Sequence, residues 1–236
     1  MFQCIHLSEL PETFYLKLDE GFRGALFNQL AQIGGRKDIS QRLGVHPSSI
    51  AEWKRGEKCI PLKIFKRIIL IFKKSLNDIE SYVEGVKASR YCKYAIALKF
   101  PIQVNEDWAY LSEIIRTDGH INCRKQIIIV NTDFGVIDQV KRSLLQIGIP
   151  IEQVKIYHRR GGTLNLVVPN ITLGFFFHSF FEIQIGNKSG NTYLPSLIKE
   201  SPISVVCASL KGIFDGDGDC YIRGKQIGLR SKSERY

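Results

Sequence analysis

The sequence predicts an α+β protein in which an all-α N-terminal domain, residues 1–100, precedes a domain of alternating helices and β-hairpins, residues 105–202. A third segment, 203–236, is expected to begin a second, truncated copy of that mixed domain. Three observations lead to this expectation: a basic helix-turn-helix pattern at about 38–56, two hairpin patterns after 105, and a nine-residue motif that occurs twice.

Composition narrows the class of protein before any motif is considered. The 236 residues are 44% hydrophobic, which excludes a disordered chain, and 33 Lys+Arg against 23 Asp+Glu give a net charge of +10. This positive balance favours a polyanionic partner, usually a nucleic acid. Six cysteines, none closer than 13 residues to the next, exclude CxxC zinc or redox motifs and indicate reduced thiols.

The sequence also indicates where the protein resides. No signal-peptide pattern opens the chain, and its most apolar stretch, 171–185, is too short to span a bilayer. That stretch is therefore expected to form a buried helix. We expect a cytoplasmic, nucleoid-associated protein with no membrane partner.

The first element expected is a helix over residues 20–33 that Gly34 and Gly35 end. The apolar stripe of this helix is Phe22, Leu26, Leu30 and Ile33.

The window that follows, 36–74, contains 11 basic and 3 acidic residues and so carries +8 of the net +10. A charge run usually indicates only a solvated helix face, so the residues within this window must decide its role.

A helix, a tight turn and a second helix are predicted within the basic window. Asp38 is expected to cap the first of these helices, which would bury Ile39 and Leu43. Gly44 can adopt the left-handed conformation that ends the helix and turns the chain.

The second helix of this pair begins at Pro47, which suits a first helical turn, and would bury Ile50 and Trp53. The pattern resembles the helix-turn-helix of repressor-type DNA-binding domains, and the alternative is a structural αα-corner on a basic surface. The candidate DNA contacts on this unit are Arg42, Ser48, Ser49, Glu52, Lys54 and Arg55.

Further along the chain, a helix is expected after residues 60–62, then a polar helix after Lys74 and an apolar segment at 94–102. Pro101 and the polar stretch 103–107 are typical of a domain boundary.

The nine-residue motif occurs at 111–119 and again at 210–218, and its two aspartates, Asp118 and Asp217, lie 99 residues apart. Each copy is predicted to be a helix that ends at a glycine. An aspartate at the negative end of the helix dipole favours a bound cation. Gly212 and Gly216 would let the two helices pack closely, and two adjacent carboxylates bind hard divalent ions such as Mg²⁺.

These motifs resemble those of the LAGLIDADG (DOD-type) homing endonucleases, in which paired motif helices join two αββαββα halves. The resemblance implies that Asp118 and Asp217 hold the metal, Mg²⁺ (or Mn²⁺), and are catalytic. It implies metal-activated water attacking phosphorus in double-stranded DNA, with each half cutting one strand. It also implies a basic residue near the metals, for which Lys188 is the first choice and Lys199 the second.

The chain between the motifs fits one complete half. Hairpins are expected at 120–131, around Arg124-Lys125, and at 154–168, around Gly161-Gly162, and helices at 134–147 and 171–185. One face of the resulting sheet would enter the major groove, although a one-residue slip would exchange the whole set of contacts. The candidates are Asn122, Arg124, Gln126, Lys155, Tyr157, Arg159, Thr163 and Asn165.

Two features depart from the family pattern. Glu113 stands where a small residue is expected, so either the first motif helix is rotated and the interface loosened or Glu113 has a partner such as Lys211. In addition, 18 residues follow Gly218, enough for one hairpin around Gly224-Lys225. A complete second half would favour a monomer, whereas an unfinished sheet invites self-association.

Several functions remain open from the sequence. The first is a site-specific, metal-dependent DNA endonuclease whose helix-turn-helix adds affinity. The second is a transcription regulator, or a degenerate endonuclease remnant, that keeps the fold without cleavage; a bacterial sporulation-regulator family combines similar domains in the other order. An intein's endonuclease insert is disfavoured, since Met1 and Tyr236 show neither a splicing cysteine nor a His-Asn pair.

Overall fold

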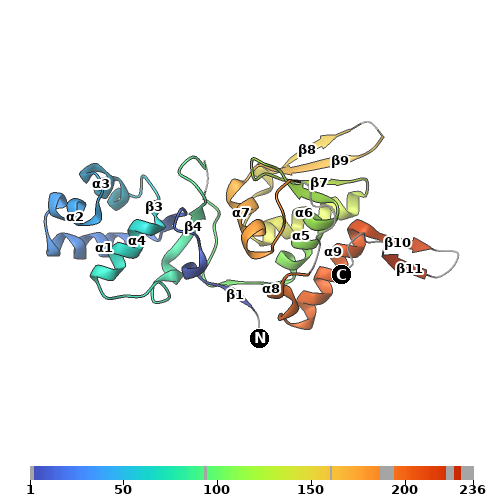
Figure 1. Cartoon of the computed structure of the whole chain (residues 1–236). Coiled ribbons are helices and arrows are strands. Elements are labelled where there is room, and N and C mark those ends of the chain that lie inside the picture. Colours follow the sequence, from blue (N-terminus) through green and yellow to red (C-terminus); the bar gives the residue numbers. More distant parts are fainter. Residues whose placement is uncertain (1–2, 93–94, 160, 187–193, 222–225, 230–236) are drawn as a thin grey trace. The chain divides into compact units, whose positions relative to one another are not determined.

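A computed structural model describes residues 3–92, 95–159, 161–186, 194–221 and 226–229. The chain divides into an N-terminal unit, Ile5–Ile102, and a C-terminal unit, Gln103–Tyr236 with Met1–Cys4 (Figure 1). Helices and antiparallel sheets are mixed along the chain, which confirms the predicted α+β class. None of the helices in these described ranges is long and apolar enough to cross a membrane.

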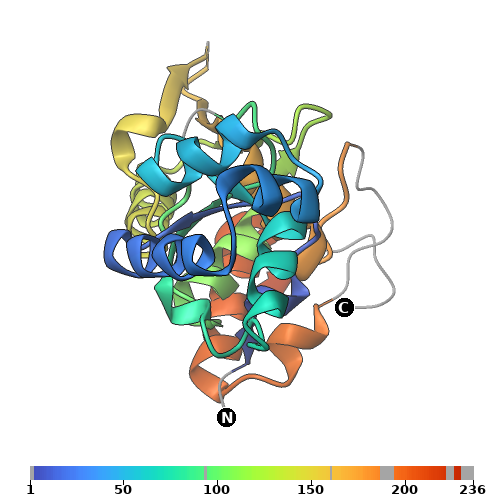
Figure 2. The ribbon, with the colours of Figure 1, turned by 90° about the vertical axis from the view of Figure 1, so that its left-hand side faces the viewer.

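Four helices dominate the N-terminal unit, and Figure 2 turns them toward the viewer. The first has the predicted bounds: Asp19 caps it by accepting the Phe22 N–H at 2.8 Å, and Gly34 follows its last residue. Leu26 and Leu30 of its stripe are buried, whereas Ile33 is 42% exposed. The helices are α1 (Glu20–Ile33), α2 (Arg36–Leu43), α3 (Pro47–Arg55) and α4 (Leu62–Ile71).

The helix-turn-helix pattern folds as predicted apart from its first cap. Gly44 ends α2 in the left-handed conformation, with φ of 69°, and Pro47 is the first residue of α3. Ile39, Leu43, Ile50 and Trp53 are all buried.

Asp38 is not the N-cap of α2, and that prediction is wrong. The helix begins two residues earlier, at Arg36, with Gly35 in the cap position. Asp38 instead lies within the first turn, where its carboxylate accepts the Gly35 N–H at 3.1 Å. A carboxylate satisfies an otherwise unpaired amide and the positive helix end from either position, so the residue type alone does not fix where the helix begins.

The N-terminal unit is not all-α, because it contains a three-stranded antiparallel sheet. In its central strand Leu16 and Leu18 are buried while Lys17 is exposed, an alternation too short to stand out in the sequence. The polar helix expected after Lys74 is also absent, because Ser75 and Asp78 exchange side-chain hydrogen bonds in a turn. The sheet has the order β3 (Ile60–Pro61), β2 (Tyr15–Leu18), β4 (Val83–Lys87), and short 3₁₀ helices lie at Leu7–Glu9 and Glu80–Tyr82.

The C-terminal unit contains a second sheet, four-stranded and antiparallel, in the order β6-β7-β9-β8. Both predicted hairpins are present, and the elements run helix, two strands, helix, two strands, helix. They are α5 (Glu106–Thr117), β6 (Gly119–Ile121), β7 (Ile127–Asn131), α6 (Phe134–Gln146), β8 (Lys155–His158), β9 (Leu164–Val168) and α7 (Ile171–Phe180), with a 3₁₀ turn at Ile151–Gln153.

Aromatic packing forms much of the core of this unit. The centroid of the Trp108 ring in α5 lies 6.2, 5.5 and 5.7 Å from the ring centroids of Phe176, Phe177 and Phe181, respectively. Helix α7 ends at Phe180 rather than at residue 185, because the chain folds back so that the Ile183 N–H donates to the Phe177 carbonyl. A turn that closes on the helix itself leaves no clear signal in an apolar stretch.

The second motif belongs to the longest helix described, α9 (Ile203–Asp217), which follows the short helix α8 (Ser196–Lys199). After α9, β10 (Gly218–Tyr221) pairs antiparallel with β11 (Gln226–Leu229), where a hairpin was predicted. The turn expected at Gly224-Lys225 lies outside the described residues. A further two-stranded pair joins β1 (Cys4–Ile5) and β5 (Ile102–Gln103).

Candidate catalytic site and nucleic-acid surface

The two motif helices, α5 and α9, pack side by side (Figure 1). Gly212 faces Tyr110 and Glu113 of α5, and one turn later Gly216 faces Thr117, so the helices run in the same direction. A Cβ at residue 212 would lie 2.7 Å from the Tyr110 carbonyl oxygen, and a Cβ at 216 would overlap the Thr117 hydroxyl. Both glycines therefore have the packing role predicted for them.

The two motif aspartates lie at the same end of this helix pair, each one residue beyond the Thr117–Gly216 contact. Asp118 is half-buried, and its carboxylate accepts a hydrogen bond from Asn131 Nδ2 at 2.5 Å. Asp217 is the exposed last residue of α9. Asn131 thus orients one of the two carboxylates, a role that the sequence did not signal.

The described residues contain no group of three or more His, Cys, Asp and Glu side chains arranged to hold a metal ion. Two carboxylates are nevertheless enough for Mg²⁺, which keeps several waters and commonly binds through one or two carboxylates plus phosphate oxygens. The chemistry of Asp118 and Asp217 at two helix C-termini fits such an ion.

Glu113 is fully buried and does not pair with Lys211, so that expectation is wrong. Its carboxylate accepts from Ser112 Oγ at 3.2 Å and lies 3.3 Å from Arg116 Nε, within its own helix. Arg116 in turn donates to the Phe181 carbonyl at 2.6 Å. The Glu113 carboxylate therefore has partners within α5, and the contacts of Gly212 and Gly216 keep the interface between α5 and α9 tight.

Lys211 instead forms an ion pair with Asp215 on its own helix and lies 4.8 Å from the centre of the Tyr110 ring. The Tyr110 hydroxyl donates to Asp215 Oδ2 at 2.9 Å across the interface. Burial, and then this hydrogen bond, raise the pKa of Tyr110 well above its usual value. The contact joins α5 to α9 through a neutral phenol.

One face of the four-stranded sheet is half-exposed, whereas Ile121, Ile129 and Leu166 on the opposite face are buried. Cross-strand register places Lys155 in one row of the half-exposed face and Tyr157, opposite Asn165, in the next. The candidates predicted on the second hairpin, Arg159 included, are alternate residues along the chain and therefore share this face. Sequence reasoning missed its other members, which are His120, Ile128, Val130 and Val167.

Arg159 and Asn165 interact on this face. In the amide orientation that satisfies both side chains, Asn165 Oδ1 accepts from Nε and Nη2 of Arg159 at 2.9 and 2.8 Å. Asn165 is consequently buried, and Arg159 is the group presented to solvent. Thr163 lies at the end of the hairpin, where its carbonyl accepts the Arg159 N–H at 2.9 Å.

The first-hairpin candidates do not lie on strands, contrary to expectation. Asn122, Arg124 and Gln126 form the turn between β6 and β7. Asn122 Oδ1 accepts the N–H groups of Arg124 and Gln126 at 2.9 and 3.0 Å, and the Asn122 amide donates to Gln126 Oε1 at 3.1 Å. Asn122 and Gln126 stabilise the turn, and the Arg124 side chain is exposed at its tip.

On the helix-turn-helix, Arg42 and Ser48 are exposed, and Ser49 is half-buried. Three other candidates have neighbouring partners. Glu52 pairs with Lys58 at 2.9 Å, Lys54 donates to Asn28 at 3.1 Å, and Arg55 donates to both oxygens of Glu57 at 2.6 and 2.8 Å. His46, which sequence reasoning did not single out, is the N-cap of α3. Of the basic candidates near the metals, Lys188 lies outside the described residues and Lys199 is exposed at the end of α8.

Comparison with known proteins adds one distant similarity. No family model matches the chain. The chain is 23% identical over 224 residues to glutamine–fructose-6-phosphate aminotransferase [isomerizing] of Methanocaldococcus jannaschii, a match that covers 93% of this chain. The chain spans 19% of the length of that protein, so the aminotransferase activity is that protein's own and the similarity assigns none here.

Proposed function

We propose that the chain is a LAGLIDADG-type DNA endonuclease: a site-specific enzyme that hydrolyses phosphodiester bonds in double-stranded DNA and depends on a divalent metal. The observation that carries this proposal is the close packing of α5 and α9, with Asp118 as the C-cap of α5 and Asp217 as the last residue of α9 at the same end of the pair. Paired helices with glycines between them and an acid at the end of each are what the motif resemblance implies.

The order of elements supports the same proposal. Helices α5, α6 and α7 alternate with two hairpins that form one antiparallel sheet, which is the αββαββα order expected of a half. Its half-exposed face carries Lys155, Tyr157 and Arg159, side chains suited to phosphate and base-edge contacts in a major groove. The helix-turn-helix would add affinity through Arg42, Ser48 and Ser49.

The metal, Mg²⁺ or Mn²⁺, would be held by Asp118 and Asp217. When bound, it would activate water and stabilise charge on the scissile phosphate. Asn131 fixes the Asp118 carboxylate through a 2.5 Å hydrogen bond, and the Thr117–Gly216 contact holds the two helix ends together. These protein groups preorganise the acids, and substrate oxygens and water would supply the remaining ligands of a bound ion.

A plasmid cleavage assay tests the proposal. Supercoiled plasmids carrying a library of inserts are incubated with the full chain and Mg²⁺ or Mn²⁺, and nicked and linear products are sequenced. Asp118→Asn and Asp217→Asn should each lower cleavage at least a hundredfold, while binding to the same DNA persists. The matched control is Asp138→Asn, which removes an exposed carboxylate paired with Lys141 at 2.7 Å on α6.

Each outcome has one meaning. Cleavage that survives both active-site substitutions would overturn the metal-site assignment. Specific binding without cleavage by the unaltered chain would overturn the nuclease and support a regulator that keeps the fold. Absence of both binding and cleavage would reject a DNA function altogether.

A further inference from the structure

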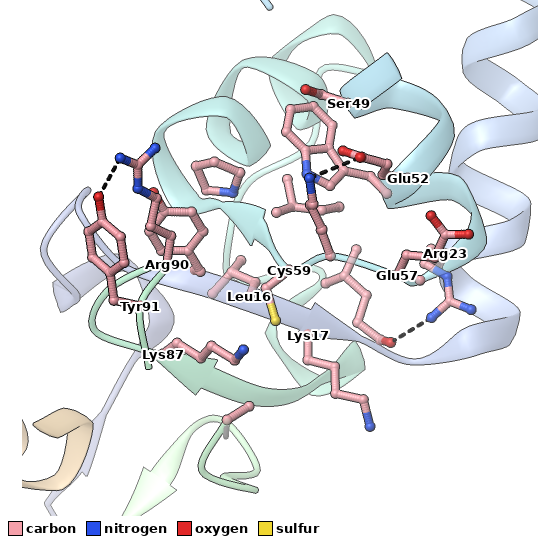
Figure 3. Close-up of a pocket in the computed structure, with 18 residues that line it drawn as sticks. Leu16, Lys17, Arg23, Ser49, Glu52, Glu57, Cys59, Lys87, Arg90 and Tyr91 are labelled. Atoms are coloured by element: carbon pink, nitrogen blue, oxygen red, sulfur yellow. Dashed lines mark hydrogen bonds and ion pairs between the residues drawn. The ribbon is translucent and has the colours of Figure 1, made fainter. Parts of the chain in front are cut away.

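A hollow of about 680 Å³ lies in the N-terminal unit between α3 and the sheet β3-β2-β4 (Figure 3). Trp53 of α3, Leu16 of β2 and Cys59 line its interior. Burial raises the pKa of the Cys59 thiol, and the nearby ammonium groups of Lys87 and Lys17 act in the opposite direction. The hollow therefore has an apolar floor with positive charge beside it.

Basic side chains outnumber acidic ones around the hollow. Its two carboxylates already face cations: Glu52 lies 2.9 Å from Lys58, and Glu57 lies 2.6 Å from Arg55. Of the basic residues, Arg23 has a structural role, because it donates to the carbonyls of Lys54 and Leu18 and packs against Gly56. Lys58 also lines the hollow, where it pairs with Glu52, and the other basic residues of the lining are Lys17, Lys87 and Arg90.

These three cations belong to the sheet and to the loop that follows β4. Lys17 pairs with Glu84 at 3.0 Å, but both side chains are about half exposed, so the pair is weak and exchangeable. Arg90 donates to the Tyr91 hydroxyl at 2.5 Å, and its guanidinium carbon lies 4.7 Å from the centre of the Tyr91 ring. The neutral Tyr91 side chain therefore orients the Arg90 guanidinium without cancelling its positive charge.

The opposite wall of the hollow is α3, the second helix of the helix-turn-helix. Ser49 and Glu52 of α3, both candidate DNA contacts, line the same space as the sheet cations. A DNA strand that brought base edges to Ser49 would place its adjoining backbone beside the sheet. Because Lys17 and Arg90 are exposed at the rim and not enclosed, the hollow suits a continuous polyanion better than a sequestered small molecule.

We propose that this hollow receives the phosphodiester backbone of DNA beside α3, with Lys17, Lys87 and Arg90 contacting successive phosphates. The proposal rests on the DNA-binding function proposed above. It adds a sheet-borne phosphate clamp that the helix-turn-helix pattern alone does not predict. Such contacts strengthen binding to every sequence and make the affinity dependent on salt.

The first test is a salt titration of DNA binding by the full chain, in which the fluorescence anisotropy of a labelled duplex reports binding. The Lys17→Ala, Lys87→Ala, Arg90→Ala triple variant should reduce the magnitude of the negative slope of log K against log [KCl] by about 2.7, at roughly 0.9 per phosphate contact. A matched variant, Lys99→Ala, Lys141→Ala, Arg142→Ala, removes the same charge elsewhere and should change the slope little.

The second test uses Cys59 as a local probe. Maleimide labelling is followed residue by residue by peptide mass spectrometry, with exposed Cys207 on α9 as an internal control. Duplex DNA should slow labelling of Cys59 several-fold and leave Cys207 unchanged. ATP and AMP are added in separate arms, since a nucleotide carries the same phosphate chemistry.

The outcomes separate this proposal from the function on which it rests. If the unaltered chain binds DNA but the two triple variants have equal slopes, the clamp is wrong and DNA binding stands. Protection of Cys59 by ATP or AMP and not by duplex would also overturn the clamp, in favour of a nucleotide site. If the unaltered chain binds no duplex, both proposals fail.

Discussion

Gly216 of α9 lies against Thr117 of α5 so closely that a Cβ added at residue 216 would be 2.5 Å from the threonine Cβ. This contact lies one residue before each motif aspartate, so it sets how closely the backbones approach at the two helix ends. Thr117 is itself held, since its hydroxyl donates to the Glu113 carbonyl at 2.9 Å. Packing at Gly216 and the backbone positions of the two aspartates are thus linked.

We expect substitution of the interface glycines to be costly. In Gly212→Ala the new methyl meets the Tyr110 backbone oxygen, which cannot move aside, so the free energy of unfolding should fall by about 1–3 kcal/mol. The control is Gly24→Ala in α1, where a Cβ meets nothing within 4 Å and the change should stabilise by up to about 1 kcal/mol. Urea unfolding measures both, and equal effects would argue against a tight interface.

Replacement of Glu113 should lower the free energy of unfolding strongly, because its carboxylate pairs with a buried arginine. Glu113→Ala leaves Arg116, 3% exposed, without its buried counter-charge, and loss of one partner of a buried pair costs roughly 3–5 kcal/mol. A double variant, Glu113→Leu with Arg116→Leu, removes both charges and should be less destabilised, although the Phe181 carbonyl then loses its donor. Urea unfolding of the two variants decides the point, since a double variant worse than the single one would contradict this account.

These residues show how far sequence reasoning reached. The bounds of α1, the Gly44 turn and the motif helices were predictable, because caps, glycines and apolar spacing are local signals. The β2–β4 pairing was not, because its strands are short and lie far apart in the sequence. The partner of Glu113 was predicted wrongly for a related reason. The sequence allows Glu113 to pair with either Lys211 or Arg116, and only the packing of the folded unit directs its carboxylate toward Arg116 of the same helix.

Alkaline pH should weaken the α5–α9 interface through Tyr110. The folded protein raises the pKa of this phenol, first by burial and then through Asp215. Unfolding therefore releases a more acidic group, so the stabilisation is complete below about pH 10, the usual tyrosine pKa, and declines as the pH rises above it.

Tyr110→Phe tests this pH dependence. At neutral pH the variant should lose about 0.5–1.5 kcal/mol with the hydrogen bond to Asp215. From about pH 10 upward, its stability should fall less steeply than that of the unaltered chain. Urea unfolding from pH 7 to 11 compares the two profiles, and parallel curves would show that Tyr110 is not responsible.

An apolar stripe on α9 predicts self-association. Ile203, Leu210 and Phe214 are 77%, 46% and 41% exposed, and they lie on one side of the helix. The residues 99 positions earlier, Val104, Leu111 and Ile115, are each 0% exposed in the C-terminal unit. Apolar residues at equivalent positions in and before the two motifs are thus buried at the first copy and exposed at the second.

We expect a second copy of the chain to cover the exposed stripe at high concentration, because burial of such side chains is favourable by about 25 cal/mol per Å². Sedimentation velocity from 1 to 100 μM should show a concentration-dependent dimer, which Leu210→Glu should abolish. Leu145→Glu is the control, since Leu145 is 55% exposed on α6 and lies outside the stripe. A monomer throughout this range, or equal effects of the two substitutions, would exclude the stripe as a self-association surface.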